Sequence, residues 1–237
     1  MSRLVALVAV LAFVPVTSPR ATSSTQAGSL TLCIVVDVSA SMGLVLLFGF
    51  DRAAADDHIT STMAGLTGLL DPGDRVRFGR IARTIAFGPG FVPREDVGGA
   101  VRALIVPAAD RYGPSPVWDA IDQALELLDG ESGRRAVIAW TDGRASGNRL
   151  SRFDVARRAR AAGVPVHVVA PPTERLIRQT GETAARIRPA TYLEWMAGAT
   201  GGQFHEAIPE PARPHGNTLK PLAAILDGLR GRPRSSR

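Results

Sequence analysis

The chain is almost without cysteine: Cys33 is the only one among 237 residues. A single cysteine cannot form an intrachain disulfide, so a packed core must stabilise the fold on its own. Because Cys33 lies inside an apolar run, we expect it to behave as a small buried hydrophobic residue. A disulfide-stabilised miniature fold is therefore excluded.

Lysine and aromatic residues are also scarce: Lys220 is the only lysine, and aromatic residues make up 5% of the chain. The formal charge of +6 therefore comes from arginine. The arginines are scattered apart from loose groups within 157–160 and 230–237, and no interleaved aromatic pattern of the kind that stacks nucleic-acid bases accompanies them. We expect a solvated basic surface and no nucleic-acid partner.

A long apolar run is missing as well. The N-terminal run, Leu4 to Val16, is shorter than the roughly 18 residues that indicate a membrane-spanning helix. It follows Met-Ser-Arg and precedes small and polar residues, which is the layout of a secretory signal peptide. We predict that residues 1–27 are a signal peptide with an undetermined cleavage point and that the protein is secreted or periplasmic. The alternative is tethering to a membrane by an uncleaved N-terminal segment.

The remaining length suffices for one domain. A chain of 237 residues with 45% hydrophobic content can bury one sizeable core. We assign residues 28–229 to this domain and residues 230–237 to a basic, disordered tail.

Strand-like and helix-like segments alternate along the domain. The segments Leu30 to Val36 and Ala136 to Trp140 are apolar at nearly every position, which is typical of strands covered on both faces. The alternation predicts an α/β fold with a doubly wound, largely parallel sheet flanked by helices. Further strands are expected at 75–81, 84–87, 164–169 and 203–206, and helices at about 52–70, 94–105, 117–128, 153–162, 192–199 and 219–229. Ser115 is expected to cap the helix that begins at Pro116.

Oxygen-bearing side chains follow the two most apolar strands. Asp37-Val38-Ser39-Ala40-Ser41 comes after the first, and Asp142 comes after the second. In a parallel sheet, loops at the carboxyl ends of neighbouring strands converge on one crevice. Carboxylates and hydroxyls suit a hard cation, and the absence of histidine and thiol from this set argues against zinc. Ser115, at the start of a helix, could add another hydroxyl.

Together these pieces resemble the von Willebrand factor type A (VWA) family and its metal-ion-dependent adhesion site (MIDAS). The resemblance rests on Asp-x-Ser-x-Ser, a Gly-x-Ser-x-x-x-Asp-Ala stretch at Gly113 to Ala120, and Thr-Asp-Gly after a later buried strand. It implies a Rossmann-like VWA fold with metal ligands Asp37, Ser39, Ser41, Ser115 and Asp142. It also implies a divalent cation, Mg²⁺ or alternatively Mn²⁺ or Ca²⁺, and a protein partner that offers an Asp or Glu to the metal.

Two positions depart from the family pattern. Ser115 stands where the family more often has threonine, and Ala40 where it often has glycine. Both changes preserve the set of oxygen donors. The resemblance therefore still predicts a secreted interaction or adhesion module.

An enzyme is the first alternative. The chain has neither a Gly-x-Ser-x-Gly nucleophile elbow nor a glycine-rich phosphate loop followed by lysine. Asp37-Val38-Ser39 resembles the Asp-x-Asp of metal-dependent phosphatases, but Ser39 replaces the carboxylate that would act as acid or base. We therefore predict that the protein is not an enzyme. A metal-free interaction scaffold is the second alternative.

The run Gly43 to Phe50 directly follows the predicted metal loop and is unusually apolar. We interpret it as a packed loop or first helical turn. The alternative is an exposed contact patch beside the metal.

Overall fold

The computed structural model describes residues 28–42, 52–171, 189–207 and 216–232. The predicted signal peptide and the apolar run Gly43 to Phe50 lie outside these residues. Within them, no helix is both long enough and apolar enough to cross a membrane.

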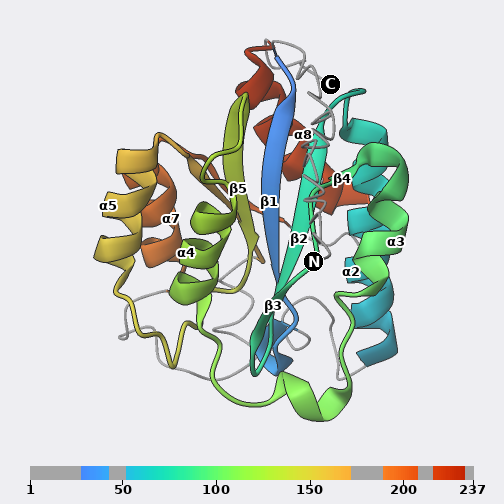
Figure 1. The fold of residues 1–237 in the computed structure, drawn as a ribbon. Helices are drawn as coiled ribbons and strands as arrows, with labels where there is room; N and C mark the ends of the chain where they lie inside the picture. The colour runs from blue at the N-terminus through green and yellow to red at the C-terminus, as the bar shows by residue number, and fades with distance from the viewer. Residues whose placement is uncertain (1–27, 43–51, 172–188, 208–215, 233–237) are drawn as a thin grey trace, which may run out of the picture.

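One mostly parallel sheet forms the centre of the molecule (Figure 1). Its seven strands in the described part of the chain are β1 (Leu30–Asp37), β2 (Arg75–Ile81), β3 (Ile85–Phe87), β4 (Val92–Pro93), β5 (Arg134–Trp140), β6 (Val166–Ala170) and β7 (Phe204–Glu206). The order across the sheet is β3-β2-β1-β5-β6-β7, and β4 also pairs with β2. β3 and β4 run antiparallel to β2, whereas all other pairs are parallel. β1 and β5 are therefore neighbours at the centre.

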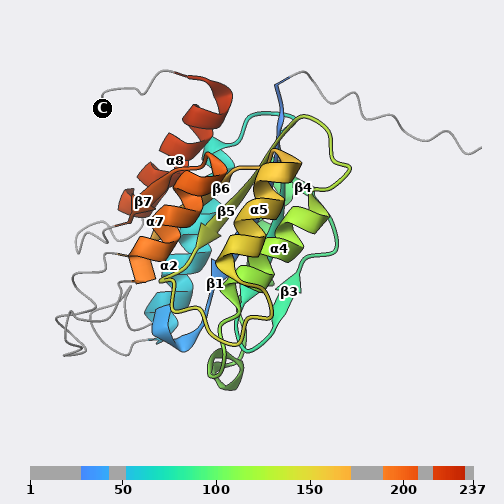
Figure 2. The same cartoon turned by 90° about the vertical axis from the view of Figure 1, so that its left-hand side faces the viewer.

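Helices cover both faces of the sheet, as Figures 1 and 2 show. They are α2 (Arg52–Gly65), α3 (Val97–Arg102), α4 (Val117–Leu127), α5 (Arg152–Ala162), α7 (Pro189–Thr200) and α8 (Gly216–Arg230), with short 3-10 turns η1 (Leu66–Leu69), η2 (Arg94–Asp96) and η3 (Ala108–Arg111). α2, α3 and α8 pack on one face, and α4, α5 and α7 pack on the other. The sheet is thus the middle of three layers.

Every residue of β1 is buried because the strand faces helices on both sides. Leu32, Ile34 and Val36 point toward α2 and α8, whereas Cys33 and Val35 point toward α4. Alternation along a strand sends neighbouring side chains to opposite faces, so a strand between two helical layers is apolar throughout. Burial also raises the pKa of the Cys33 thiol to about 12, which fits its expected role as a core residue.

The predicted α/β architecture is confirmed, with differences at the boundaries of elements. The sequence pattern did not reveal the two-residue strand β4, because so short a pairing leaves no periodicity. The helix expected over about 94–105 is shorter and divides into η2 and α3. The other strands and helices follow one another along the chain as predicted.

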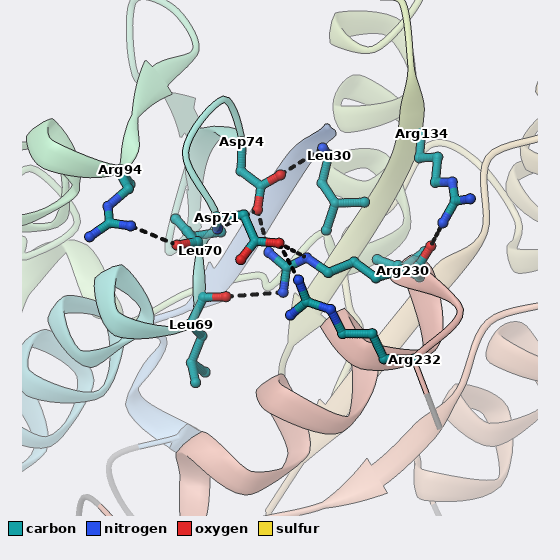
Figure 3. A network of polar contacts seen from close by, with 10 residues as sticks. Leu30, Leu69, Leu70, Asp71, Asp74, Arg94, Arg134, Arg230 and Arg232 are labelled. Atoms are coloured by element: carbon teal, nitrogen blue, oxygen red, sulfur yellow. Dashed lines mark hydrogen bonds and ion pairs between the residues drawn. The ribbon is translucent and has the colours of Figure 1, made fainter. Parts of the chain in front are cut away.

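The C-terminal helix ends within one residue of its expected end. The sequence pattern predicts a helix to about residue 229, and α8 ends at Arg230, whose side chain is only 7% exposed. Arg230 binds Asp71 and Asp74, which lie in the turn before β2, and Arg232 also binds Asp71 (Figure 3). These ion pairs hold the end of α8 against the turn that precedes β2.

Candidate functional site

The site begins where β1 and β5 end side by side. The two strands are parallel, and Val36 pairs with Trp140 in their register. Asp37 and Thr141 therefore leave neighbouring strands at the same level of the sheet, and Asp142 follows one residue later. The sequence left open whether these two strands are neighbours, and the structure shows that they are.

Asp37 is the centre of the site and is completely buried. Its Oδ1 accepts the backbone N–H of Ser39 at 2.9 Å. Its Oδ2 accepts hydrogen bonds from the hydroxyls of Thr141 at 2.7 Å and Ser115 at 3.3 Å. Three different segments of the chain thus converge on one carboxylate, which fixes its orientation.

The two serines of the first loop lie beside this carboxylate. The hydroxyl oxygens of Ser39 and Ser41 are 3.1 Å apart. Ser39 is buried and Ser41 is half-buried. The Ser41 hydroxyl also helps to favour the charged form of Asp142, which places it between the two strand ends.

Ser115 does not cap its own helix, contrary to the sequence-based expectation. α4 begins at Val117, its N-cap residue is Pro116, and that residue provides no side-chain hydrogen bond. The first turn of α4 is instead capped from another loop, because the side-chain oxygen of Asn148 accepts the backbone N–H of Trp118 at 2.7 Å. The Ser115 hydroxyl is therefore free of the capping role and is directed at Asp37.

Asp142 completes the set at the end of β5. Gly143 has a positive φ of 75°, a conformation that suits glycine, and it turns the chain so that the backbone N–H of Arg144 binds Asp142 Oδ1 at 3.0 Å. The other oxygen, Oδ2, is buried and accepts no hydrogen bond from the described residues. The Arg144 Nε lies 4.0 Å from it, at the limit of an ion pair.

The two carboxylates are held in an unfavourable environment. Burial, followed by the negative charge of Asp142, raises the pKa of Asp37 to about 6, although hydrogen bonds from Ser39 and Thr141 oppose this. Burial also raises the pKa of Asp142, against the effect of the Arg144 backbone N–H. Two nearby buried anions therefore repel each other in the absence of a cation.

The structure thus brings together all five residues that the sequence singled out: Asp37, Ser39, Ser41, Ser115 and Asp142. No group of three or more His, Cys, Asp or Glu side chains in the described part of the chain could hold a metal ion. Any cation at this site would therefore depend on serine hydroxyls in addition to two carboxylates, a donor set that suits a hard ion.

Sequence reasoning missed a layer of residues that support this set. Thr141 was noted only as part of a motif, yet it is fully buried and binds both Asp37 and the backbone N–H of Gly143. Asp119 accepts the backbone N–H groups of Arg149 and Leu150. Burial works against its ionisation, but these N–H groups outweigh burial and hold the pKa of Asp119 below its ordinary value.

The supporting residues tie the loop after β5 to the start of α4. Besides Asn148 and Asp119, the Ser146 hydroxyl accepts the backbone N–H of Ser115 at 3.0 Å, and the backbone N–H of Ser146 binds the Ser115 carbonyl at 2.9 Å. Thr141 could have been found from its place at a strand end. Asn148 carries no comparable signal, because its partners are 29 and 30 residues away.

The comparisons with known proteins show that this chain shares its fold with solved structures, but they reveal no family model or curated protein of similar sequence. Among solved structures, the conserved hypothetical protein BatB from Bacteroides thetaiotaomicron superposes with a TM-score of 0.61 at 14% identity, covering 86% of this chain and 100% of that one. The von Willebrand factor type A protein from Catenulispora acidiphila gives 0.59 at 15% identity, covering 84% and 43%.

A third match is the vWF domain of the type V pili tip protein Mfa5 from Porphyromonas gingivalis. It has a TM-score of 0.58 at 12% identity and covers 89% of this chain and 98% of that domain. These matches confirm the fold that the sequence resemblance implied: the chain has the VWA fold.

Proposed function

We propose that this VWA-fold chain is a protein-interaction module that binds a divalent cation at the ends of β1 and β5. The ligands would be Asp37, Ser39, Ser41, Ser115 and Asp142, and Mg²⁺ is the preferred ion, with Mn²⁺ and Ca²⁺ as alternatives. The cation would in turn accept an Asp or Glu carboxylate from a protein partner.

The observation that carries this proposal is the hydrogen bond that the Ser115 hydroxyl donates to Asp37. A serine before a helix ordinarily caps that helix. Here Asn148 provides the cap, and the Ser115 hydroxyl points to a buried aspartate on another strand. Ser115 therefore does not act as a helix cap, and its hydrogen bond to Asp37 supports its assignment as a metal ligand.

The charges of the site fit a cation as well. Asp142 Oδ2 is buried without a hydrogen bond from the described residues, which is costly for a carboxylate oxygen. Burial, and after it the neighbouring charge of Asp142, raises the pKa of Asp37. A bound divalent cation would satisfy the free oxygen and neutralise the repulsion between the two carboxylates.

The donor set also explains how a partner would be recognised. Two carboxylates balance the charge of a divalent cation, whereas neutral hydroxyls leave the ion electrophilic. Bound Mg²⁺ commonly retains waters that an incoming ligand can replace, so it would supply a Lewis-acidic position for a carboxylate. The residues of this chain would only bind and orient the ion; no nucleophile or proton donor is required of them.

We propose a non-enzymatic role outside the cytoplasm. The predicted signal peptide supports export, and fold relatives include a domain of a pilus tip protein and an aerotolerance-related membrane protein from Bacteroides fragilis. At the identities observed, these relatives share the fold with this chain, so their locations serve here only as support.

Calorimetric titration with MgCl₂ tests the metal site. We expect one bound ion per chain for the wild type and loss of binding in Ser115→Ala and Asp37→Ala. Ser29→Ala is the matched control, because Ser29 is also buried and lies at the opposite end of β1. Absence of Mg²⁺, Mn²⁺ and Ca²⁺ binding in the folded wild type would contradict the proposal and favour a metal-free scaffold.

Retention on a polyaspartate resin tests the recognition of carboxylates. We expect the wild type to be retained with Mg²⁺ and released by EDTA, and Ser115→Ala to pass through in both conditions. The two proteins have the same net charge, so attraction between a basic protein and the resin is identical for both. Equal retention of the two would contradict a metal-mediated contact.

A further inference from the structure

Two aromatic side chains meet on the surface between α5 and α7. The described residues include three exposed large hydrophobic side chains: Tyr112 at 54%, Phe153 at 53% and Trp195 at 39%. Phe153 and Trp195 pack edge to face, with ring centroids 5.0 Å apart. Figure 2 shows that their helices, α5 and α7, lie side by side. Two of these three exposed side chains therefore lie together at one place.

An arginine lies within the same cluster. The Arg152 guanidinium is 4.5 Å from the ring centroid of Phe153 and 4.0 Å from that of Tyr192. Described carboxylates form ion pairs with Arg149, Arg157 and Arg158 but not with Arg152. Arg152 thus combines a flat stacking surface with a positive charge that lacks a carboxylate partner in the described structure.

The packing of α5 does not require these exposed rings. Val155, Ala156 and Ala159 attach the helix to the core. A capping box between Ser151 and Asp154 fixes its first turn. An edge-to-face pair adds little stability beyond that of its buried area, whereas a polar residue at 153 would keep the exposed surface soluble. The aromatic character of Phe153 therefore calls for another explanation.

The cluster lies at the same edge of the sheet as the candidate metal site. α5 starts with Arg152 after the loop that follows β5, and Tyr192 and Trp195 are in the first two turns of α7. Both helices begin at the carboxyl edge of the parallel sheet, where Figure 2 shows their first turns together. A partner that approaches this edge can reach the cluster from the side.

We propose that Arg152, Phe153, Tyr192 and Trp195 form a docking surface for an acidic protein segment that carries an aromatic or aliphatic anchor residue. The anchor packs on Phe153 and Trp195, and a carboxylate beside it binds Arg152. This contact does not need the cation, so it goes beyond the proposed metal-dependent recognition and stands separately from it.

The charge of α5 favours an acidic protein segment at the docking surface. α5 carries four arginines against a single aspartate. Arg157, Arg158 and Arg160 are all exposed, but Arg157 and Arg158 form ion pairs with Asp154 and Asp122, so the excess positive charge of α5 lies on Arg152 and Arg160. An acidic segment is attracted to this helix and a basic one is repelled, while the aromatic rings select an apolar side chain among the acidic residues.

A labelled peptide of the sequence EELEEFEELEEF serves as the probe, in the presence of EDTA and at low salt. Trp118 and Trp140 are 7% and 1% exposed, so quenching of protein fluorescence by acrylamide reports mainly on Trp195. We expect the peptide to protect this fluorescence, and the neutral analogue with glutamine in place of glutamate to give no protection.

Variants locate the contact. We expect Arg152→Gln and Phe153→Ser to weaken binding, measured by fluorescence anisotropy, by about fivefold or more, and Phe153→Tyr to retain it. Arg160→Gln is the matched control, because it removes the same charge from an exposed position on the same helix. Phe153 is exposed, so its replacement should leave the domain folded, which thermal unfolding verifies.

Three outcomes would overturn the docking surface. The first is that the peptide fails to protect the fluorescence of Trp195 at its highest soluble concentration. The second is that Arg160→Gln weakens peptide binding as much as Arg152→Gln does. The third is that Phe153→Ser binds the peptide as tightly as the wild type. Because EDTA is present throughout, these results are independent of the metal site. Failure of the docking surface and failure of metal binding are thus distinguished.

Discussion

Thr141 has the most direct effect on the central carboxylate of the candidate site. Its hydroxyl donates to Asp37 Oδ2 at 2.7 Å in a fully buried position. Hydrogen bonds to charged groups typically stabilise a fold by about 1.5 to 3 kcal/mol. Above the Asp37 pKa of about 6, the carboxylate is charged and depends on this donor. We expect Thr141→Val to lower the free energy of unfolding by about that amount at pH 8 in EDTA, measured by urea denaturation.

Thr62 provides the matched control for this substitution. Its hydroxyl is buried and has no hydrogen-bond partner among the described residues. The same change, Thr62→Val, removes an unsatisfied polar group and should leave stability unchanged or raise it. An equal loss in both variants would show that valine is tolerated poorly at buried threonines in general and that the bond to Asp37 has no special weight.

His167 makes stability depend on pH. It is buried in β6, where its Nδ1 accepts the backbone N–H of Gln203. Burial, together with the charge of nearby His205, lowers the pKa of His167 from 6.5 to about 4. Between these values the unfolded chain binds a proton that the folded chain does not. The stabilisation is therefore complete above pH 6.5 and is lost as pH falls toward 4.

The expected loss between pH 7 and pH 4.5 is about 2 to 3 kcal/mol from this residue. His167→Asn is the comparison, because an asparagine oxygen can replace Nδ1 as the acceptor and does not titrate. The difference in unfolding free energy between wild type and variant should shrink as pH falls through this window. A difference that stays constant with pH would show that His167 is not the titrating group.

The residues of the candidate site differ in how far sequence could reveal them. Asp37 and Asp142 were located because each follows a strand whose apolar pattern is continuous, and strand ends of a parallel sheet converge. Ser115 was located by its motif but was given the wrong local role. That role depends on Asn148, whose contact with Trp118 spans 30 residues and leaves no periodic or local signal.

At the scale of elements, long periodic segments were predictable and the shortest one was not. α4 and β1 were predicted within a residue or two of their bounds because burial imposes a period on them. β4 escaped prediction because its pairing with β2 decides it. The end of α8 was predicted within a residue, but the ion pairs that hold it there, between Arg230 and the aspartates of a distant turn, leave no signal in the local sequence.

Arg230 holds the end of α8 to the start of the sheet. It binds Asp74, Asp71 Oδ2 at 2.9 Å and the Leu69 carbonyl at 3.1 Å (Figure 3). Asp74 is 1% exposed and also accepts the backbone N–H of Leu30, where β1 begins. Removing one partner of a buried pair typically costs about 3 to 5 kcal/mol. We expect Arg230→Met to destabilise the domain on that scale, measured by urea denaturation.

Arg232 allows the same charge to be removed without disturbing a buried group. Its side chain is 51% exposed and binds Asp71 at 2.6 Å. Exposed ion pairs typically contribute about 1 kcal/mol or less. Arg232→Met should therefore change stability little. Similar losses in the two variants would show that the burial of Asp74 does not govern the contact.

At the scale of the whole molecule, the candidate site lowers the stability of the fold. Two buried carboxylates, one with an oxygen that has no hydrogen bond within the described structure, oppose folding while no cation is bound. Such a site persists only where the rest of the fold over-determines it, here through Thr141 and the loop that Asn148 ties to α4. These contacts hold the geometry of the site without help from a cation, so the proposed ion would meet a site that is already formed.

One substitution should therefore affect stability in opposite directions without a cation and with Mg²⁺. Asp142→Asn removes the repulsion with Asp37 and replaces a charged buried group by a neutral amide, so in EDTA it should be at least as stable as the wild type. A ligand that binds only the folded state stabilises it by about 2.7 kcal/mol at one hundred times its dissociation constant. Mg²⁺ should therefore raise the unfolding temperature of the wild type but not that of Asp142→Asn.

Thermal unfolding over a series of MgCl₂ concentrations, with NaCl adjusted to constant ionic strength, measures both halves of this prediction. The two curves of melting temperature against Mg²⁺ should cross, with the variant above at low concentration and the wild type above at high concentration. Parallel curves would mean that any effect of Mg²⁺ arises away from Asp142. A variant less stable than the wild type in EDTA would mean that the Asp142 carboxylate is already satisfied in the fold without a metal ion.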